Sequence, residues 1–318
     1  MTEEKEEILF TIVTPVYNGA DWIGETVDSV LSLCADENFE YIVVNDGSTD
    51  ATQEVLAKYE GRIRVENQKN QGEANAVNRG LMLGSGEFAL IVSADDPMRS
   101  FQLLSKARTI LGEDRSIMCA YPDWSVIDSS SQIIRDVIVP EFSEKKLIGE
   151  FNCIVGPGGV FRRREALLIG GRDPQYKFTS DYDFWLRLSR LGRFQRIPGQ
   201  LAYWREHDLS TSIAFRGREM GDERIKVIKN FLDTNPELPK ELKNMARGYS
   251  HLQAALLIYF DKTIPAKRWL FQALIYYPNG IRKFSVKVML YILLFPISPV
   301  LLEILRKTGI YRKPPSSA

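Results

Sequence analysis

The stretch that decides the fold is ILFTIVTPVYNGADWIGETVDSVLSLCADENFEYIVVND, residues 8–46. It begins with an apolar, β-branched run that Pro15 stops, and it ends with a second such run over residues 39–46. Residues 21–33, between the two runs, carry apolar side chains at helical spacing. A strand, a helix and a strand of these lengths predict a βαβ unit with the two strands parallel in one sheet.

The alternation of strand and helix continues as far as the aspartate pair at 95–96. It predicts the following segments: a helix over 48–59, a strand over 62–67, a helix ending near Gly84 and a strand over 87–96. These strands are almost continuously apolar, which is typical of a parallel sheet covered on both faces. After Phe101 the pattern is mixed, with strands or a hairpin and then a helix over 180–192. The fold class is therefore α/β.

Composition bounds the class of protein. The chain has 318 residues, is 44% hydrophobic and 26% charged, and carries no net charge, which indicates a globular protein and gives no sign of nucleic-acid binding. Its acidic start, MTEEKEE, is followed by no apolar stretch typical of a secretory signal. The three cysteines, an odd number, are far apart, which favours free thiols in a reducing compartment.

The charge is unevenly distributed along the chain. From Asp261 onward ten Lys and Arg stand against two acidic residues, a net charge of +8, so the preceding residues carry −8. Everything after Gly217 has a helical pattern, and we place the domain boundary near Ala214, which gives a first domain over 1–214 and a helical region over 215–318.

Residues 261–313 are both basic and apolar, which suits a helix lying in an anionic membrane interface. Their most apolar stretch, VMLYILLFPISPVLLEIL (288–305), is interrupted by Pro296, Pro299 and Glu303. A spanning helix needs about twenty clean apolar residues. The alternatives to a membrane-surface segment are a helical subdomain packed on the core and a re-entrant or spanning segment.

Polar residues follow the predicted strands at the point where each ends. Tyr17 and Asn18 follow the first strand, Asp46 the second, and Asp95 and Asp96 the fourth. Open parallel sheets bind ligands in a crevice at this edge. Two adjacent carboxylates repel each other, so their presence indicates either a solvated turn or a divalent cation held by oxygen ligands.

The sequence does not support either of two common kinds of nucleotide site, the dinucleotide fold and the P-loop. The string GSGEFA (84–89) resembles a dinucleotide fingerprint but precedes a strand, where it cannot place a pyrophosphate at a helix N-terminus. The sequence contains no G-x-x-x-x-G-K-[ST] motif of a P-loop.

Five motifs in order resemble family 2 glycosyltransferases with a GT-A fold: TIVTPVYNGADWIGETVDSVL, VVNDGSTDAT, NQGEANAVNRGL, SGEFALIVSADDP and SDYDFWLRL…YWREHDLSTS. The resemblance covers roughly residues 8–212. It implies a Rossmann-like, mainly parallel mixed sheet flanked by helices. It also implies that a nucleoside diphosphate sugar is the donor, and that sugar transfer proceeds with inversion.

The resemblance assigns the donor contacts. Pro15 and Tyr17 would line the base pocket, and Asp46 would accept a hydrogen bond from the base. Asn75 and Asn78 would lie near the base or ribose, and Asp95 would also contact the nucleotide sugar. The alternative for Asp46 is an Asx turn, and for the two asparagines it is helix capping and packing.

The same resemblance implies a divalent cation, Mg²⁺ or Mn²⁺, held by Asp96 and Asp95. His207 is a further candidate ligand, which would favour Mn²⁺, and the alternative is a plain surface histidine. Ser93 stands where the family usually has another aspartate. This departure puts the ribose contacts in question more than the metal.

The general base implied by the resemblance is Asp181, at the start of the 180–192 helix, with Asp183 in reserve. Ser180 replaces an acid that usually precedes it. The alternative for Asp181 is a helix N-cap. Arg187 and Arg205 would pair with these acids or with the diphosphate.

We therefore predict an inverting, metal-dependent glycosyltransferase on the cytoplasmic face of a membrane, in cell-surface polysaccharide or lipid-linked glycan synthesis. Its partners would be a nucleoside diphosphate sugar and a glycan or lipid-linked acceptor, with no nucleic acid. Two alternatives stay open. One is a catalytically silent protein that binds nucleotide sugars, suggested by Ser93 and Ser180. The other is a nucleotidyltransferase on a related fold, which would release pyrophosphate.

Overall fold

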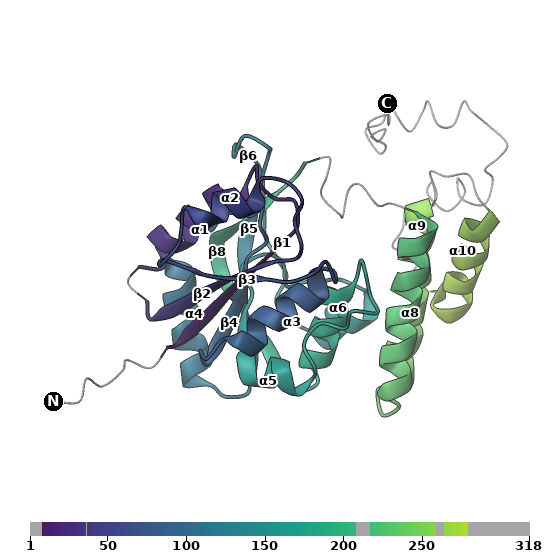
Figure 1. Cartoon of the computed structure of the whole chain (residues 1–318). Helices are drawn as coiled ribbons and strands as arrows, with labels where there is room; N and C mark the ends of the chain where they lie inside the picture. The colour runs from purple at the N-terminus through teal and green to yellow at the C-terminus, as the bar shows by residue number, and fades with distance from the viewer. Residues whose placement is uncertain (1–7, 36, 208–216, 259–263, 279–318) are drawn as a thin grey trace.

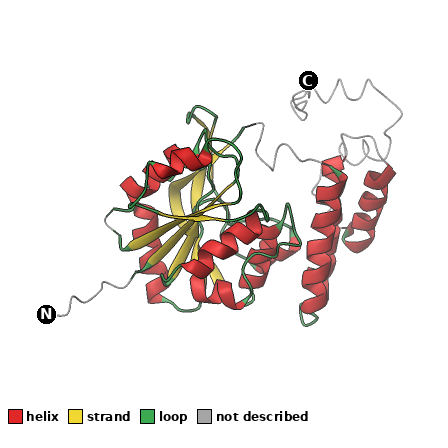
Figure 2. Cartoon of the chain, in the orientation of Figure 1, coloured by secondary structure: helices red, strands yellow, loops and turns green. Residues whose placement is uncertain are grey.

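The computed structural model describes residues 8–35, 37–207, 217–258 and 264–278. Within these ranges a single sheet carries helices on both faces, and three further helices stand beside it (Figure 1; Figure 2). The predicted α/β architecture is confirmed.

The sheet has eight strands, in the order β3-β2-β1-β4-β7-β5-β6 with β8 paired to β5. The strands are β1 (Phe10–Val16), β2 (Phe39–Asn45), β3 (Arg64–Asn67), β4 (Phe88–Ile91), β5 (Ile117–Ile127), β6 (Ile133–Val137), β7 (Val160–Arg162) and β8 (Arg193–Arg205). The first four are parallel, and β7 runs antiparallel to both β4 and β5. The sheet is therefore mixed but parallel where the predicted ligand crevice lies.

Helices cover the sheet because its strands are apolar on both sides. Those of the sheet-bearing part are α1 (Ile23–Leu33), α2 (Thr52–Ala57), α3 (Glu73–Leu83), α4 (Gln102–Glu113), α5 (Arg163–Leu168) and α6 (Ser180–Leu188). In β1, Phe10 and Ile12 join one buried core with residues of α1 and α4, whereas Val13 joins the other with Val77 of α3. Alternate residues of one strand thus anchor both helical layers.

Two features differ from the prediction. The strand expected over 87–96 pairs only from Phe88 to Ile91, and the chain then turns, with the Asp96 N–H donating to the Ser93 carbonyl (3.1 Å). The sequence pattern gave no sign of β7 or α5, which are three and six residues long. The cysteines are free, as expected, and Cys34 and Cys119 are buried.

The C-terminal helices are α8 (Arg218–Thr234), α9 (Lys240–Ile258) and α10 (Ile264–Tyr276). They pack on one another, α8 contacts α6, and α9 contacts the π-helical turn Lys145–Gly149. This confirms a helical C-terminal region. The boundary at 214 and the apolar stretch 288–305 lie outside the described residues. In the part of the chain that the structure describes, we find no helix that is both long enough and apolar enough to cross a membrane.

One glycine sets the distance between α3 and the sheet. A Cβ at Gly80 would lie 2.3 Å from Cγ1 of Val13, a buried β-branched side chain in β1. We expect Gly80→Ala to lower the free energy of unfolding by about 1–3 kcal/mol, the usual cost of overpacking. Urea denaturation measures this, with Gly112→Ala as the control, because a Cβ at Gly112 meets nothing within 4 Å. Equal stability of the two variants would contradict the proposed close packing.

Candidate active site

The ends of three parallel strands bring the predicted donor residues to one edge of the sheet. The last residues of β1 and β2, Val16 and Asn45, are partners in register, and β4 pairs with β1 on its other side. Tyr17, Asp46 and the Asp95–Asp96 pair follow these strand ends directly or after a short turn. The edge therefore carries an aromatic ring and three carboxylates on neighbouring connections.

The loop after β1 is tied to the loop after β2. Asn18 donates its N–H to Ser48 Oγ (2.9 Å), and its Oδ1 accepts from the Thr49 N–H (2.8 Å). Asn18 has a φ of 51°, a left-handed conformation that asparagine tolerates. Pro15 is buried within β1, whereas Tyr17 is 51% exposed. Of the two predicted base-pocket residues, only Tyr17 has an accessible ring, and a contact of either residue with a base stays a prediction.

Asp46 is buried and holds the loop between β3 and α3. Its Oδ1 accepts from Gln68 Nε2 (2.7 Å) and the Gln71 N–H (2.8 Å), and its Oδ2 accepts from the Gly72 N–H (2.8 Å). Instead of closing an Asx turn, Asp46 thus bonds a distant loop, and its neighbour Asn45 holds the local turn through Oδ1, which accepts from the Ser48 N–H three residues on (3.1 Å). A contact between Asp46 and a base stays a prediction, and it would use a lone pair beyond these three bonds.

Asn75 and Asn78 lie on α3 and face a groove of about 530 Å³. Asn75 Nδ2 donates to the Gln71 carbonyl (2.8 Å). Asn78 bonds Arg172 in both directions, Nδ2 to its carbonyl (2.7 Å) and Oδ1 from its N–H (2.8 Å). Asn78 therefore fixes the loop before α6, as the packing alternative predicts, while a contact of Asn75 with the base or ribose stays a prediction.

Arg205 organises the aspartate pair. Its N–H donates to Asp96 Oδ1 (2.6 Å) and its Nε to the Asp95 carbonyl (2.7 Å), while its Nη2 pairs with Glu25 Oε2 (2.7 Å). The Arg205 side chain is fully buried. Burial, followed by the charge of Asp95, raises the pKa of Asp96 well above its usual value. The charge of the buried Arg205, at the end of β8, thus offsets part of the repulsion between Asp95 and Asp96.

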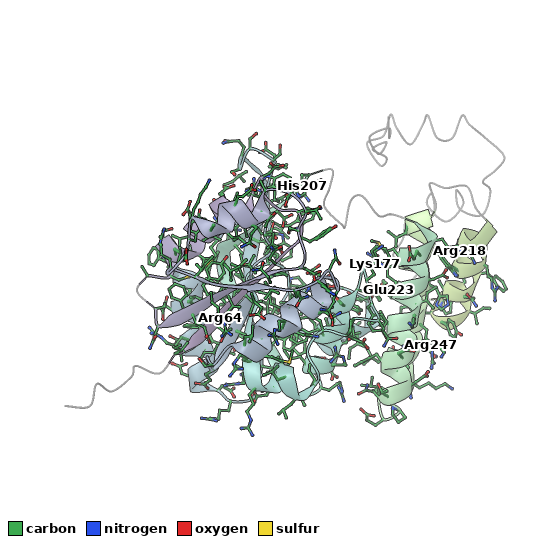
Figure 3. All side chains as sticks on the ribbon, viewed as in Figure 1. Arg64, Lys177, His207, Arg218, Glu223 and Arg247 are labelled. Atoms are coloured by element: carbon green, nitrogen blue, oxygen red, sulfur yellow. The ribbon has the colours of Figure 1, made fainter. Side chains whose placement is uncertain are left out.

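His207 lies beside Asp95. Its Nε2 is 2.9 Å from Asp95 Oδ2, and its ring centroid is 4.2 Å from that of Trp22 (His207 is labelled in Figure 3). The structure therefore excludes a plain surface histidine. No group of three or more His, Cys, Asp or Glu side chains within the described ranges is arranged to hold a metal ion. The donor set nevertheless fits one, since carboxylate oxygens suit Mg²⁺ and Mn²⁺ and an imidazole suits Mn²⁺.

The two acids at the start of α6 have different surroundings. Asp183 is buried in an ion pair with Arg187, whose Nε and Nη2 lie 2.8 and 2.5 Å from Asp183 Oδ2. Arg187 also donates to the carbonyls of Ile169 (2.6 Å) and Gly171 (2.7 Å). Asp183 thus braces the preceding loop, which makes it a weaker candidate for the base than Asp181.

Asp181 is partly buried and has no close ion pair among the salt bridges formed by the described residues. Burial raises the pKa of its carboxyl, the charge of Arg172 acts in the opposite direction, and Glu73 adds to the rise. Arg172 itself pairs with Glu73 through Nη1 (2.5 Å). A carboxyl with a raised pKa, near cations without being neutralised by one, is chemically suited to accept a proton.

Several of these partners had no signal in the sequence. Arg172 and Glu73 beside Asp181, and Glu25 on Arg205, are brought together from segments 99 and 180 residues apart. Each is an ordinary charged residue in a helix or loop pattern. Only an alignment of related sequences or the structure itself could single them out.

Comparison with known proteins agrees with this geometry. The family model Glycosyl transferase family 2 matches residues 11–167. A glycosyltransferase of Rickettsia typhi is 30% identical over 215 residues, which are 64% of this chain and 66% of that protein. One of Haemophilus influenzae is 30% identical over 241 residues, 70% of this chain and 72% of that protein. Chondroitin synthase of Pasteurella multocida is 31% identical over 210 residues, 64% of this chain but 21% of that protein.

Solved structures share the fold. S. aureus TarS 1-349 in complex with UDP-GlcNAc aligns over 96% of this chain and 93% of that one, with a TM-score of 0.64 and 18% identity. Mannosyltransferase PcManGT of Pyrobaculum calidifontis, in complex with GDP-Man and Mn²⁺, aligns over 95% and 81% with a TM-score of 0.55. At such low identity these likenesses speak for the fold alone, which is GT-A.

The chain spans between about a fifth and two thirds of the length of the first relatives it matches. The Haemophilus influenzae relative is matched over more than two thirds of its length, and the family model covers the strands and helices that carry the donor edge. The chain belongs to glycosyl transferase family 2.

Proposed function

We propose that the chain is an inverting, divalent-cation-dependent glycosyltransferase that uses a nucleoside diphosphate sugar. The observation that carries the proposal is the separation of its carboxylates between two elements. Asp95 and Asp96 follow β4 at the edge where β1 and β2 end, whereas Asp181 is the second residue of α6. Binding a cation and accepting a proton from the acceptor hydroxyl require carboxylates at two separate places, and these two elements supply them.

The donor half is the sheet edge. Tyr17 would stack on the base, Asp46 would hold the 68–72 loop against it, and Asn75 would reach the base or ribose. The complexes of TarS with UDP-GlcNAc and of PcManGT with GDP-Man suggest UDP and GDP sugars as the first donors to test.

Asp96, Asp95 and His207 would hold the cation. When bound, it would supply Lewis-acid neutralisation of the charge that gathers on the departing diphosphate. The Mn²⁺ in the PcManGT complex makes Mn²⁺ the first cation to test. Arg205 would keep the two aspartates in place, because it bonds the side chain of one and the carbonyl of the other.

The acceptor half is built around Asp181. An acceptor hydroxyl is a poor nucleophile until its proton is removed, and Asp181 would accept that proton at a carboxylate oxygen. The chondroitin synthase relative suggests a glycan acceptor and polysaccharide synthesis as the setting.

The experiment that tests this function is a nucleotide-release assay on the purified chain. UDP-GlcNAc, UDP-glucose, UDP-galactose and GDP-mannose are supplied with Mn²⁺, with p-nitrophenyl glycosides as acceptors. We expect release of UDP or GDP with one of these donors and loss of release in EDTA. Binding of a nucleotide sugar without any turnover would favour the silent binding protein that Ser93 and Ser180 suggest.

We also propose peripheral membrane contact through the C-terminal region. On α10 the side chains of Phe271 and Ile275 are 63% and 62% exposed, and Arg268, one turn earlier, is exposed too. This face carries an apolar and a basic component, as a helix at an anionic surface does.

We expect the double variant Phe271→Glu/Ile275→Glu to bind vesicles of equal phosphatidylglycerol and phosphatidylcholine at least tenfold more weakly. Burying such a side chain is worth about 1.5–3 kcal/mol, more than a tenfold change requires. Cosedimentation at low and high salt measures this, and binding should weaken as salt screens the basic residues. The control is Ile133→Glu/Ile134→Glu in β6, also an exposed pair. Wild-type protein that ignores these vesicles at low salt would contradict the proposal.

A further inference from the structure

Helix α8 is hydrogen-bonded to the segment before α6 through the carboxylate of Glu223. Glu223 Oε2 accepts from the Lys177 N–H (2.9 Å), and Glu223 Oε1 accepts from the N–H groups of Phe178 and Thr179 (both 2.7 Å) and from Thr179 Oγ1 (2.9 Å). Figure 3 labels Lys177 and Glu223 side by side where α8 meets the rest of the molecule. A single side chain thus gathers three consecutive backbone donors.

These three donors lie immediately before α6, whose second residue is Asp181. The first N–H groups of a helix lack partners within it, and an anion there is favoured by the helix dipole. The cap residue Thr179 makes no side-chain capping bond of its own. Glu223, 44 residues downstream of Thr179, supplies the anion instead, through charge-assisted hydrogen bonds.

The next residue of α8 is a partly buried arginine. Arg224 interacts electrostatically with Asp181, Tyr182 and Cys153, and its Nη1 donates to Gln253 Oε1 of α9 (2.9 Å). Its guanidinium lies 5.6 Å from the centre of the Phe151 ring. Two consecutive residues of α8 therefore act on the start of α6, one by hydrogen bonds and one by charge.

We propose that Glu223 is a positioning residue for sugar transfer, and that α8 is therefore a working part of the acceptor half of the active site. This rests on the proposed function of Asp181 as the general base. By fixing residues 177–179, Glu223 sets where the first turn of α6 lies and hence where the Asp181 carboxylate meets the acceptor hydroxyl. Displacement of a reacting group by about 1 Å can reduce a rate by about a hundredfold.

Such a role predicts a split between catalysis and donor binding. The donor residues follow β1, β2 and β4, and none of them bonds to residues 177–179 in the interactions that the described residues make. Loss of the Glu223 carboxylate should therefore lower kcat and leave the affinity for the donor as it was.

The test uses Glu223→Ala and Glu223→Gln, assayed with the donor and acceptor that the wild type turns over. We expect kcat to fall about ten- to a hundredfold in Glu223→Ala, with the donor Kd measured by calorimetry within twofold of wild type. Glu223→Gln should fall between Glu223→Ala and wild type, because its amide oxygen can still accept from Phe178 and Thr179 while its amide nitrogen cannot accept from the Lys177 N–H. The matched control is Asp222→Ala, the neighbouring residue of α8, whose side chain forms an exposed ion pair with Arg218 (3.4 Å) and no other hydrogen bond or ion pair within the described ranges.

Asp181→Asn is assayed in parallel and separates the two proposals. If Asp181→Asn loses transfer while Glu223→Ala keeps wild-type kcat, the positioning role of Glu223 is overturned. If Asp181→Asn transfers normally, the proposed base is wrong, whatever Glu223 does. If Glu223→Ala fails to fold, Glu223→Gln decides: a folded Gln variant with wild-type kcat, or one whose donor Kd weakens in step with kcat, contradicts the proposal.

Discussion

Replacing Asp181 by asparagine should lower kcat for sugar transfer by at least about a hundredfold, the usual scale for loss of a general base. The amide has the same shape as the carboxylate but cannot accept the proton of the acceptor hydroxyl. Donor affinity should stay within twofold, because the donor contacts lie on other elements. Nucleotide release for kcat and calorimetry for the donor Kd measure the two effects separately.

The control for this variant is Asp183→Asn. Asp183 is paired with Arg187, so its loss should loosen the 169–171 loop and reduce transfer less than the loss of Asp181 does. If the two effects are reversed, the base is Asp183. If neither variant changes transfer, the mechanism with a general base in α6 is wrong.

The same residue predicts a pH dependence. Burial raises the pKa of Asp181 above the ordinary value of an aspartate, although the charge of Arg172 opposes the rise and Glu73 adds to it. A general base works in its ionised form, so kcat should fall as the pH drops through this raised pKa. A carboxyl whose pKa is raised by folding stabilises the folded state most at low pH, and that contribution is lost as the pH rises through the raised value. Asp181→Asn should therefore be at least as stable as wild type at neutral pH.

The second large effect is expected at Asp96. Replacing it by alanine should weaken Mn²⁺-dependent binding of UDP or GDP by at least about a hundredfold, since loss even of outer-shell partners weakens metal sites about 10–100-fold. Binding in EDTA should not change. Calorimetry with and without Mn²⁺ measures the difference.

Two further variants guard this result. Asp96→Asn keeps an oxygen that can accept from the Arg205 N–H, so it should fold as wild type does and still lose metal-dependent binding. Asp233→Ala removes an exposed carboxylate of α8 and should change nothing. Unchanged metal-dependent affinity in both Asp96 variants would show that Asp96 holds no cation.

The part of the fold that follows from local pattern could be predicted from the sequence. The β1-α1-β2 unit and the end of α3 at Leu83, just before Gly84, follow from apolar periodicity and from glycine or proline stops. β7 could not be predicted, because a strand of three residues is too short to show a repeating pattern. Its place in the sheet depends on pairing with β4, whose residues lie 70 or more positions away in the sequence.

The candidate site divides in the same way. Asp46, Asp95 and Asp96 could be proposed from the sequence because they follow strand ends, and parallel sheets bind ligands at the edge where their strands end. The hydrogen bonds from Arg205 to Asp96 and Asp95 join residues that are 109 and 110 positions apart. No local sequence pattern predicts such bonds. In the sequence, Glu223 looks like any other acidic residue of an amphipathic helix. Its four hydrogen bonds to residues 177–179 in the folded chain distinguish it from those residues.

The central claim is inverting, cation-dependent sugar transfer, and proton NMR of the product tests it most directly. The purified chain is incubated with an α-linked nucleotide sugar, a p-nitrophenyl glycoside acceptor and Mn²⁺, and the anomeric coupling of the newly formed glycosidic linkage is measured. The account predicts a β-linked product, formed with stoichiometric release of the nucleoside diphosphate and absent when EDTA is added. An α-linked product, or equal turnover in EDTA, would contradict it.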